Sequence, residues 1–229
     1  MRFLKLLYEM AYPSQFSFEH LKTLKSFKQK KEYIESMLQK IGAGSSRIVY
    51  QVDNEKVLKL AKNRKGLAQN EVEYNNASDD LDCFSKIYNF DSEGYWIEAE
   101  IAKKCKPSDV KRLYGISFDQ LRAFIAESVY EYADNRERII LKGIIRQYNG
   151  SNESLLQLYY DEKLPEQLYD FLDSLHYYLS NYQPRYNEVA DYFRLANWGI
   201  VTRNAQESMV IIDSGLNEEV YHNYYKKSF

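Results

Sequence analysis

The sequence predicts an α+β protein in which a small antiparallel sheet is followed by a helical half. Between about residues 41 and 102, short apolar stretches alternate with glycine and Asp-Asn turn signals, which is typical of strands. From 107 to 182, apolar residues recur at helical spacing. A last pair of apolar stretches surrounds a turn at 203–207. The 229 residues suffice for one large domain or for two lobes that share a cleft.

Composition narrows the class of protein. The 31 basic and 33 acidic residues give a net charge of −2, so no global field draws the chain to nucleic acid or anionic lipid. The 22 tyrosines fall mostly at helical spacing, which favours core and rim positions over base stacking. Cys83 and Cys105 stand far apart, which argues against a disulfide framework and a zinc site. Two separate cysteines fit a reducing compartment, so we expect a cytoplasmic protein. We expect no membrane partner, because the apolar run in residues 1–10 is too short and interrupted for a signal peptide or membrane span.

Residues 1–40 are predicted to form a helical extension. The first apolar stripe consists of Phe3, Leu4, Leu7 and Met10. Ser17 is placed to cap a second helix. The apolar residues of that helix are Leu21, Leu24, Phe27 and Tyr33.

The first strands surround a glycine turn. Residues 41–52 are predicted to form strand, turn and strand, and 57–60 a third strand. Gly42 and Gly44 lack the Cβ that would keep backbone N–H groups from a phosphate. Lys59 lies in the middle of the third strand among apolar neighbours, so its ammonium group needs an anion there. The alternative is a lysine on an edge strand or one that faces solvent.

A helix and two more strands complete the predicted first half. The helix spans 66–77 and carries Glu71 and Glu73; we favour Glu73 as the partner of Lys59, and the alternative for either is a surface carboxylate. Strands at 84–90 and 95–101 bring the antiparallel sheet to about five strands. Residues 102–105 are then expected to leave the sheet as a connector.

The second half is predicted to be helical. Ser117 and Gln120 form a capping box, and Pro165 opens another helix. The apolar faces of both helices are assigned to the core. The three histidines have no ligand spacing, so no metal or acid–base role is assigned to them.

Three oxygen-bearing side chains follow near the end of the chain. Asp191 and Asn197 lie on one predicted loop, and Asp213 closes a β-branched strand after a hairpin. The two turns are expected to converge. Mg²⁺ prefers one or two carboxylates together with phosphate oxygens, so this pattern suits a cation that carries a phosphate.

At these residues the chain resembles the protein-kinase-like superfamily, in a shortened form similar to small bacteriophage-encoded kinase-like proteins and to small-molecule phosphotransferases. The matching positions are two glycines and a valine of the glycine loop (Gly42, Gly44, Val49), the strand lysine (Lys59), the catalytic aspartate (Asp191) and the metal-binding pair (Asn197, Asp213). The resemblance implies a two-lobed fold, with an antiparallel-sheet N-lobe at 41–102 and a truncated helical C-lobe at 103–229.

The resemblance also implies roles and cofactors, namely ATP and Mg²⁺. Asn197 and Asp213 would hold Mg²⁺, and Asp191 would orient or deprotonate an acceptor hydroxyl, with Arg194 beside it. Lys59 would contact the α- and β-phosphates. The expected nucleotide site consists of Gly42, Gly44, Ser45, Ser46, Arg47, Val49, Lys59 and Glu73, with the backbone near Glu100 and Ala102 facing the adenine edge.

Four departures from the family pattern bear on function. Arg47 replaces the third glycine, although an arginine there could itself contact phosphate. Asn197 lies six positions after Asp191, where kinases have five. Ser214 replaces the phenylalanine of the metal-binding triplet, and only fourteen residues follow Gly215. These departures favour nucleotide binding over protein phosphorylation.

Two functions are therefore expected from the sequence. The first is an ATP- and Mg²⁺-dependent phosphotransferase with an unknown acceptor, encoded by a phage and present in the host cytoplasm. The alternative is a pseudokinase that works through a protein partner, as an interaction protein or a component of the virion. The kinase-like arrangement requires Lys59 and Asp213 to meet across one crevice.

Overall fold

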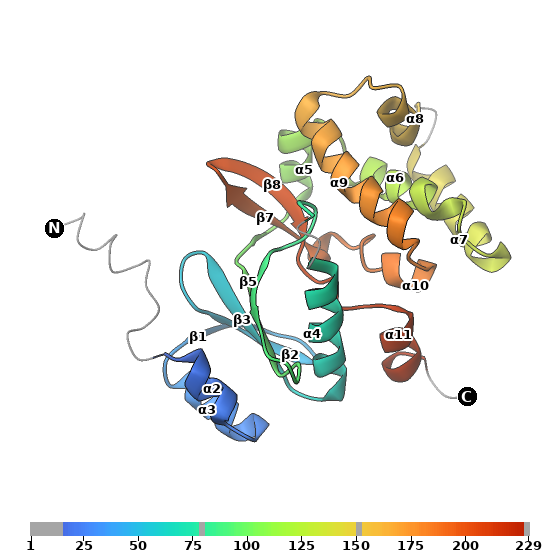
Figure 1. The fold of residues 1–229 in the computed structure, drawn as a ribbon. Coiled ribbons are helices and arrows are strands. Elements are labelled where there is room, and N and C mark those ends of the chain that lie inside the picture. Colours follow the sequence, from blue (N-terminus) through green and yellow to red (C-terminus); the bar gives the residue numbers. More distant parts are fainter. Residues whose placement is uncertain (1–15, 78–80, 150–152, 227–229) are drawn as a thin grey trace. The chain divides into compact units, whose positions relative to one another are not determined.

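The computed structural model describes residues 16–77, 81–149 and 153–226, and the chain divides into two compact units (Figure 1). The first unit holds the described residues before 78 together with 85–101; the second holds those from 81 to 84 and from 102 onward. The first is a five-stranded antiparallel sheet with helices, and the second is mainly helical, which confirms the α+β class. The predicted apolar stripe from Phe3 to Met10 lies outside the described residues.

The first unit contains the predicted sheet and one helix more than expected. Its sheet has the strand order β1-β2-β3-β5-β4, and every neighbouring pair is antiparallel. Its elements are α2 (Phe18–Thr23), α3 (Phe27–Glu35), β1 (Gln39–Ala43), β2 (Arg47–Gln51), β3 (Lys56–Ala61), α4 (Arg64–Ala77), β4 (Ile87–Phe90) and β5 (Trp96–Glu100).

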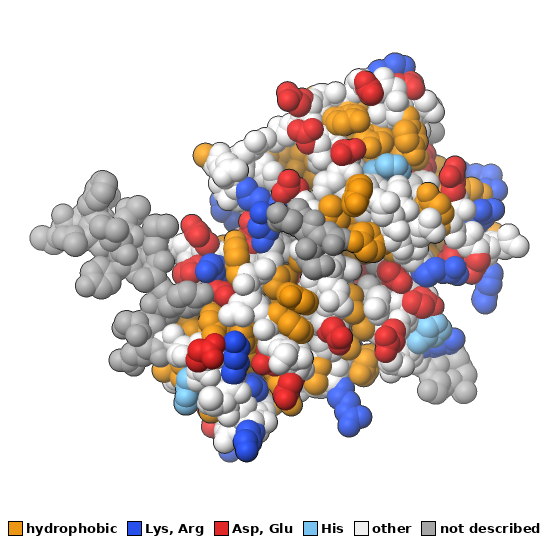
Figure 2. Space-filling view, in the orientation of Figure 1, with side chains coloured by type: hydrophobic (Ala, Val, Ile, Leu, Met, Phe, Trp, Pro, Cys, Tyr) orange, Lys and Arg blue, Asp and Glu red, His pale blue; other side chains and the backbone are white. Residues whose placement is uncertain are grey.

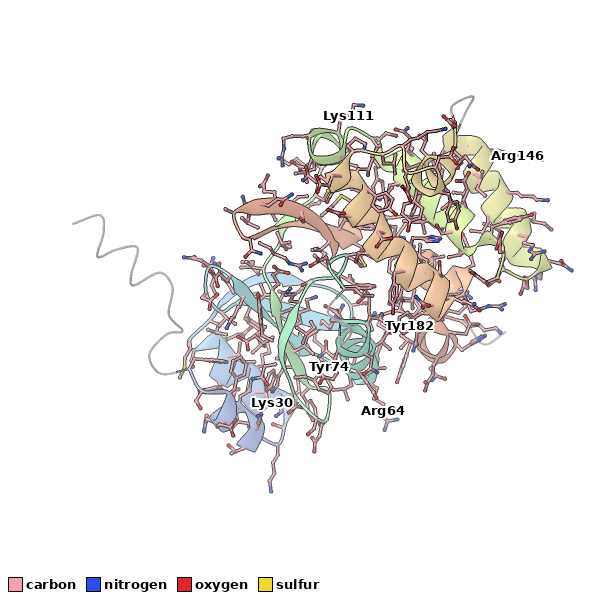
Figure 3. The ribbon with its side chains drawn as sticks, turned by 45° about the horizontal axis from the view of Figure 1, so that its top comes forward. Lys30, Arg64, Tyr74, Lys111, Arg146 and Tyr182 are labelled. Atoms are coloured by element: carbon pink, nitrogen blue, oxygen red, sulfur yellow. The ribbon has the colours of Figure 1, made fainter. Side chains whose placement is uncertain are left out.

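The helix predicted to follow Ser17 is two helices, which corrects the sequence analysis. Ser17 caps α2 as expected, but the chain becomes extended at Leu24, and Ser26 starts α3 with a capping box to Gln29. The buried Lys30 on α3 (Figure 3) donates from Nζ to the carbonyl of Leu21 at 3.1 Å. This bond fastens α3 to the C-terminal end of α2.

Helices cover both faces of the central strands. On one face, Tyr50, Leu58, Leu60 and Trp96 form a single buried cluster with Leu21 and Ile34 of α2 and α3. The alternate residues of β2 and β3 point to the opposite face, where α4 packs. There, Tyr74 of α4 (Figure 3) stacks on Phe90 of β4, with ring centroids 4.3 Å apart. The helices predicted as an extension therefore share the core of the sheet.

The second unit is built around a helical core. Its elements are β6 (Lys103–Lys104), α5 (Pro107–Tyr114), α6 (Phe118–Tyr130), α7 (Asn135–Asn149), α8 (Leu155–Tyr160), α9 (Glu166–Tyr182), α10 (Tyr186–Val189), η1 (Leu195–Asn197), β7 (Trp198–Arg203), β8 (Gln206–Ile211) and α11 (Glu218–Tyr224). Ser117 and Gln120 form the expected capping box on α6.

Within the described ranges, no helix is both long and apolar enough to span a bilayer. Acidic and basic side chains are interspersed on the face shown in Figure 2.

A three-stranded sheet lies in the second unit, where the sequence analysis expected a hairpin and a connector. Residues 103 and 104, predicted as part of the connector, pair as β6 with Ile200 and Gly199 of β7. A Cβ at Gly199 would meet the Cβ of Ala102 at 2.5 Å, so this close pairing requires glycine. The β7–β8 turn has Asn204 and Ala205 at φ 51° and 63°, the left-handed pair of a two-residue hairpin.

Gly66→Ala tests the packing of α4, and Gly143→Ala in α7 serves as its comparison. A Cβ at Gly66 would lie 2.3 Å from the carbonyl oxygen of Ser46, so Gly66→Ala is expected to lower the free energy of unfolding by about 1–3 kcal/mol. At Gly143, within α7, no heavy atom apart from its chain neighbours and the nearby helix backbone lies within 4 Å of the point that a Cβ would occupy, so Gly143→Ala is expected to raise the free energy of unfolding by up to about 1 kcal/mol. Urea denaturation measures both. An increase in Gly66→Ala would contradict the described packing.

Candidate active site

Lys59 and Glu73 form an ion pair inside the first unit. Lys59 lies in the middle of β3 on the face that α4 covers, and its ammonium group donates to the carboxylate of Glu73. The two side chains are 9% and 3% exposed. Glu71 is exposed on α4. Of the two carboxylates considered for Lys59, the structure therefore brings Glu73 to it.

Arg47 shares the same carboxylate. Val49 is the cross-strand neighbour of Lys59, and Arg47, two residues away on β2, faces α4 on the same side of the sheet. Its Nη1 donates to the second oxygen of Glu73 at 2.5 Å and to Oδ1 of Asn70 at 3.3 Å. From the sequence, an arginine at position 47 could itself contact a phosphate. Such a contact would have to come from guanidinium N–H groups other than those of Nη1, which binds Glu73 and Asn70.

The predicted glycine turn is the β1–β2 hairpin. Gly42 lies inside β1, opposite Val49, and the N–H of Gly44 donates to the carbonyl of Arg47 at 2.9 Å to close the turn. The hydroxyl of Ser46 is buried and donates to Gln69 of α4. Among the predicted phosphate-binding residues, Ser46 and Arg47 thus direct their side chains to α4.

The tip of this hairpin is also fastened to the connection between β3 and α4. Lys62 donates from Nζ to the carbonyl of Gly44 at 2.6 Å, and Lys65 donates from Nζ to Oγ of Ser45 at 2.8 Å. Ser45 and Gly44 are exposed. The turn is therefore held by hydrogen bonds to its carbonyl and hydroxyl oxygens. Because the donors lie just before and at the start of α4, the position of the turn depends on that helix.

Glu100 and Ala102, predicted to face an adenine edge, lie on either side of the division between the units. The N–H of Glu100 donates to the carbonyl of Lys86 at 2.8 Å, and its carbonyl accepts from Oγ of Ser85 at 3.3 Å. An adenine group at Glu100 would have to share this carbonyl with Ser85. Ala102 directly precedes β6 and packs against Gly199.

Asp191, Asn197 and Asp213 converge within the second unit. Asn197 donates from Nδ2 to the carbonyl of Asp191 at 2.9 Å, and its own carbonyl accepts from the N–H of Ile212 at 2.9 Å. The pairing of Trp198 with Ile211 fixes this register. Asp213, the residue after Ile212, is therefore held beside the turn that carries Asn197. The Oδ1 of Asn197 is the acceptor end of the amide and is the atom suited to a cation.

The electrostatic setting of Asp191 supports this proximity. Burial raises the pKa of the Asp191 carboxyl, and the negative charge of Asp213 raises it further, while Arg194 acts in the opposite direction. Arg194 reaches Oδ1 of Asp191 with Nη1 at 3.3 Å, but its side chain is 72% exposed, so water screens this pair. A carboxylate whose pKa is raised is a stronger base for a hydroxyl proton.

The donors at this site are hard oxygen atoms. Asp213 offers a carboxylate and Asn197 an amide oxygen, which are ligands that Mg²⁺ accepts. In the part of the chain that the structure describes, no group of three or more His, Cys, Asp or Glu could hold a metal ion. A cation held by Asp213 and Asn197 would complete its shell with further oxygen ligands, such as phosphate oxygens or water.

Two further side chains hold the Asp191 loop and were not predicted from the sequence. Trp198 donates from Nε1 to the carbonyl of Tyr192 at 2.8 Å, and Arg122 donates from Nε to the carbonyl of Phe193 at 2.8 Å. A buried indole N–H needs an acceptor, so the sequence could have suggested that Trp198 donates a hydrogen bond to the nearby loop. Arg122 lies 71 positions before its acceptor, and no local pattern indicates that contact.

The two groups of residues are thus each assembled within one unit. Lys59, Glu73 and Arg47 belong to the first unit, and Asp191, Asn197 and Asp213 to the second. The meeting of Lys59 and Asp213 across one crevice stays a prediction.

The ion-pair cluster predicts a stability effect at Glu73. Glu73→Gln removes the charge that faces both Lys59 and Arg47, so we expect the free energy of unfolding to fall by about 3 kcal/mol. Glu71→Gln makes the same chemical change at an exposed position of the same helix, where we expect a change within about 0.5 kcal/mol. Equal values for the two variants in urea denaturation would count against a role for Glu73 in stability.

The raised pKa of Asp191 predicts a pH-dependent effect. The carboxyl group of Asp191 binds its proton more tightly in the folded protein than in the unfolded chain. Ionisation of Asp191 therefore lowers stability as the pH rises from the ordinary pKa of about 4 through the raised pKa. Asp191→Asn should therefore raise the free energy of unfolding at about pH 8, and the gain should shrink toward about pH 3. Asp170→Asn, on the exposed side of α9, provides the baseline. A gain largest at low pH would contradict the sign.

The comparisons with known proteins give little to set beside this geometry. No protein-family model matches the chain, and no curated protein matches it. Among solved structures, the chain is similar to the streptomycin-ATP-APH(2")-IIa ternary complex, with 11% identity, a TM-score of 0.35, and a match that covers 84% of this chain and 71% of that chain. At this identity and TM-score, the likeness decides neither the fold nor the activity.

Proposed function

We propose that the protein is an ATP- and Mg²⁺-dependent phosphotransferase of kinase-like architecture. The proposal rests chiefly on the convergence of Asp191, Asn197 and Asp213. The side chain of Asn197 donates to the carbonyl of Asp191, and the N–H of the residue before Asp213 donates to the carbonyl of Asn197, so two hydrogen bonds tie all three residues to the same turn. The Lys59–Glu73 pair in the other unit adds a second part of the machinery that such an enzyme requires. In the proposed enzyme, both groups face one nucleotide.

The roles follow from the chemistry of the side chains. Asp213 and Oδ1 of Asn197 would hold Mg²⁺, which when bound neutralises charge on the transferred phosphate. Lys59, oriented by Glu73, would contact the phosphates. Asp191 would accept a proton from the acceptor hydroxyl, a task for which its raised pKa suits it.

The rest of the predicted site is supported unevenly. Gly44 and Ser45 lie at an exposed hairpin tip; the N–H of Gly44 already donates to the carbonyl of Arg47, so the proposal has the backbone of Ser45 approach the phosphate. Ser46 and Arg47 would act through their backbone, because their side chains bind α4. In full, we propose a phage-encoded enzyme that acts in the host cytoplasm on an acceptor that is not identified.

A pseudokinase is the second candidate. Arg47 binds the second oxygen of the carboxylate that Lys59 binds, so Lys59 shares the group that orients it with another cation. Loss of that orientation would weaken phosphoryl transfer without loss of the fold, because catalysis depends on positioning. Such a protein would work through a protein partner or in a virion. Nucleotide binding without turnover is its signature.

A melting-temperature experiment tests the proposed function. ATP with Mg²⁺ should raise the melting temperature of the wild-type protein by mass action, and Mg²⁺ or ATP alone should raise it less. Asp213→Asn should abolish the Mg²⁺-dependent part with little loss of stability, and Lys59→Ala should weaken ATP binding measured by calorimetry.

The control for Asp213→Asn is Asp170→Asn, which makes the same change at an exposed position of α9, outside the site. It should keep the wild-type shift. A full Mg²⁺-dependent shift in Asp213→Asn would sink the proposed role of Asp213, and unchanged ATP affinity in Lys59→Ala would remove Lys59 from the site.

A further inference from the structure

The loop that carries Asp191 is held by side chains at three successive carbonyls. Asn197 donates to the carbonyl of Asp191 at 2.9 Å, Trp198 to that of Tyr192 at 2.8 Å, and Arg122 to that of Phe193 at 2.8 Å. Asn197 and Trp198 belong to the same turn or the strand that follows it. Arg122 is different, because it reaches the loop from helix α6.

The guanidinium group of Arg122 is fixed on several sides. Its Nη1 donates to Oδ1 of Asp119 at 2.7 Å, and its plane lies over the ring of Phe118 at 4.6 Å and near that of Tyr148 at 5.3 Å. The side chain is 25% exposed. An arginine held by an ion pair and by aromatic rings cannot rotate freely, so its Nε–H defines where the Phe193 carbonyl lies.

The position of that carbonyl bears directly on Asp191. Phe193 is two residues after Asp191, and the N–H of Arg194 donates back to the carbonyl of Asp191 at 3.1 Å. The stretch from 191 to 194 is therefore a single tight turn. A shift of its far end would move the Asp191 carboxylate relative to Asn197 and Asp213.

We propose that Arg122 is a positioning residue, which anchors the Asp191 loop to α6 so that the Asp191 carboxylate is presented to the acceptor of phosphoryl transfer. This inference rests on the proposed function. It extends that function to a residue that carries no part of the nucleotide or metal site and that acts through the backbone of the loop.

Arg122→Lys tests this inference, and Arg112→Lys is its matched control. Arg122→Lys keeps the charge but replaces the planar fork by a flexible ammonium, which cannot hold Asp119, the rings and the carbonyl in one fixed geometry. Arg112 on α5 pairs with Asp109 three residues before it, as Arg122 pairs with Asp119, and its other described ion pair is with Glu207. Arg112→Lys thus makes the same change without touching the loop.

The first measurement is amide hydrogen exchange of residues 192–197 in the full-length protein. Exchange there should be faster in Arg122→Lys than in the wild type and unchanged in Arg112→Lys, because loss of the anchor lets the turn open more often. Unchanged exchange in Arg122→Lys would overturn the positioning role, whatever the activity of the protein. Melting temperatures of both variants show that each is folded.

The second measurement is turnover of Mg·ATP with water as the acceptor, read as ADP release. Arg122→Lys should lower kcat by about 10- to 100-fold and leave the affinity for Mg·ATP within about twofold, since displacing a catalytic group costs rate rather than ground-state binding. Arg112→Lys should match the wild type. An equal kcat in Arg122→Lys and the wild type would also overturn the inference.

The two proposals fail in different ways. A wild-type protein that neither binds nor turns over Mg·ATP would overturn the proposed function, and the inference with it. A wild type that turns over Mg·ATP, combined with wild-type exchange of the loop or a wild-type kcat in Arg122→Lys, would overturn the inference alone. A raised KM with unchanged kcat would assign Arg122 to binding and would likewise contradict the positioning role.

Discussion

The carboxylate of Glu73 is the constraint on which the first unit depends. Charged groups are seldom buried without a partner, and here one carboxylate meets a cation from β2 and another from β3. The interaction works because cross-strand register puts Arg47 and Lys59 on the same face of the sheet. It fixes the position of α4, and through Ser46, Lys62 and Lys65 the glycine hairpin is tied to the same helix.

The second unit solves a different problem, which is to keep a loop of irregular backbone in one conformation. Loop carbonyls that are not in a sheet or helix need donors, and three of them receive side-chain donors. One donor comes from the next turn, one from β7 and one from α6. Such a loop is preorganised before any ligand arrives, which is the condition under which a carboxylate can act on a hydroxyl without reorganisation.

Much of this arrangement could be predicted from periodicity and turn residues. The apolar neighbours of Lys59 and the glycine turn indicated the strands, and the capping box at Ser117 indicated the start of α6. The break between α2 and α3 was missed because apolar spacing continues through it, while the decisive signal, Ser26 with Gln29, is a local capping pattern. The inward turn of Arg47 and the reach of Arg122 depend on tertiary contacts, for which a single sequence holds no record.

Because helices cover both faces of the sheet, the position at which a recombinant fragment can begin is restricted. Apolar periodicity suggests a boundary near residue 40, between helices and strands. However, the side chains of Leu21 and Ile34 close the same apolar cluster as Tyr50, Leu60 and Trp96. A recombinant fragment that started at β1 would leave one face of its strands in contact with water, which is the condition that promotes aggregation. Expression of the sheet-bearing unit alone should therefore retain the helices that precede it.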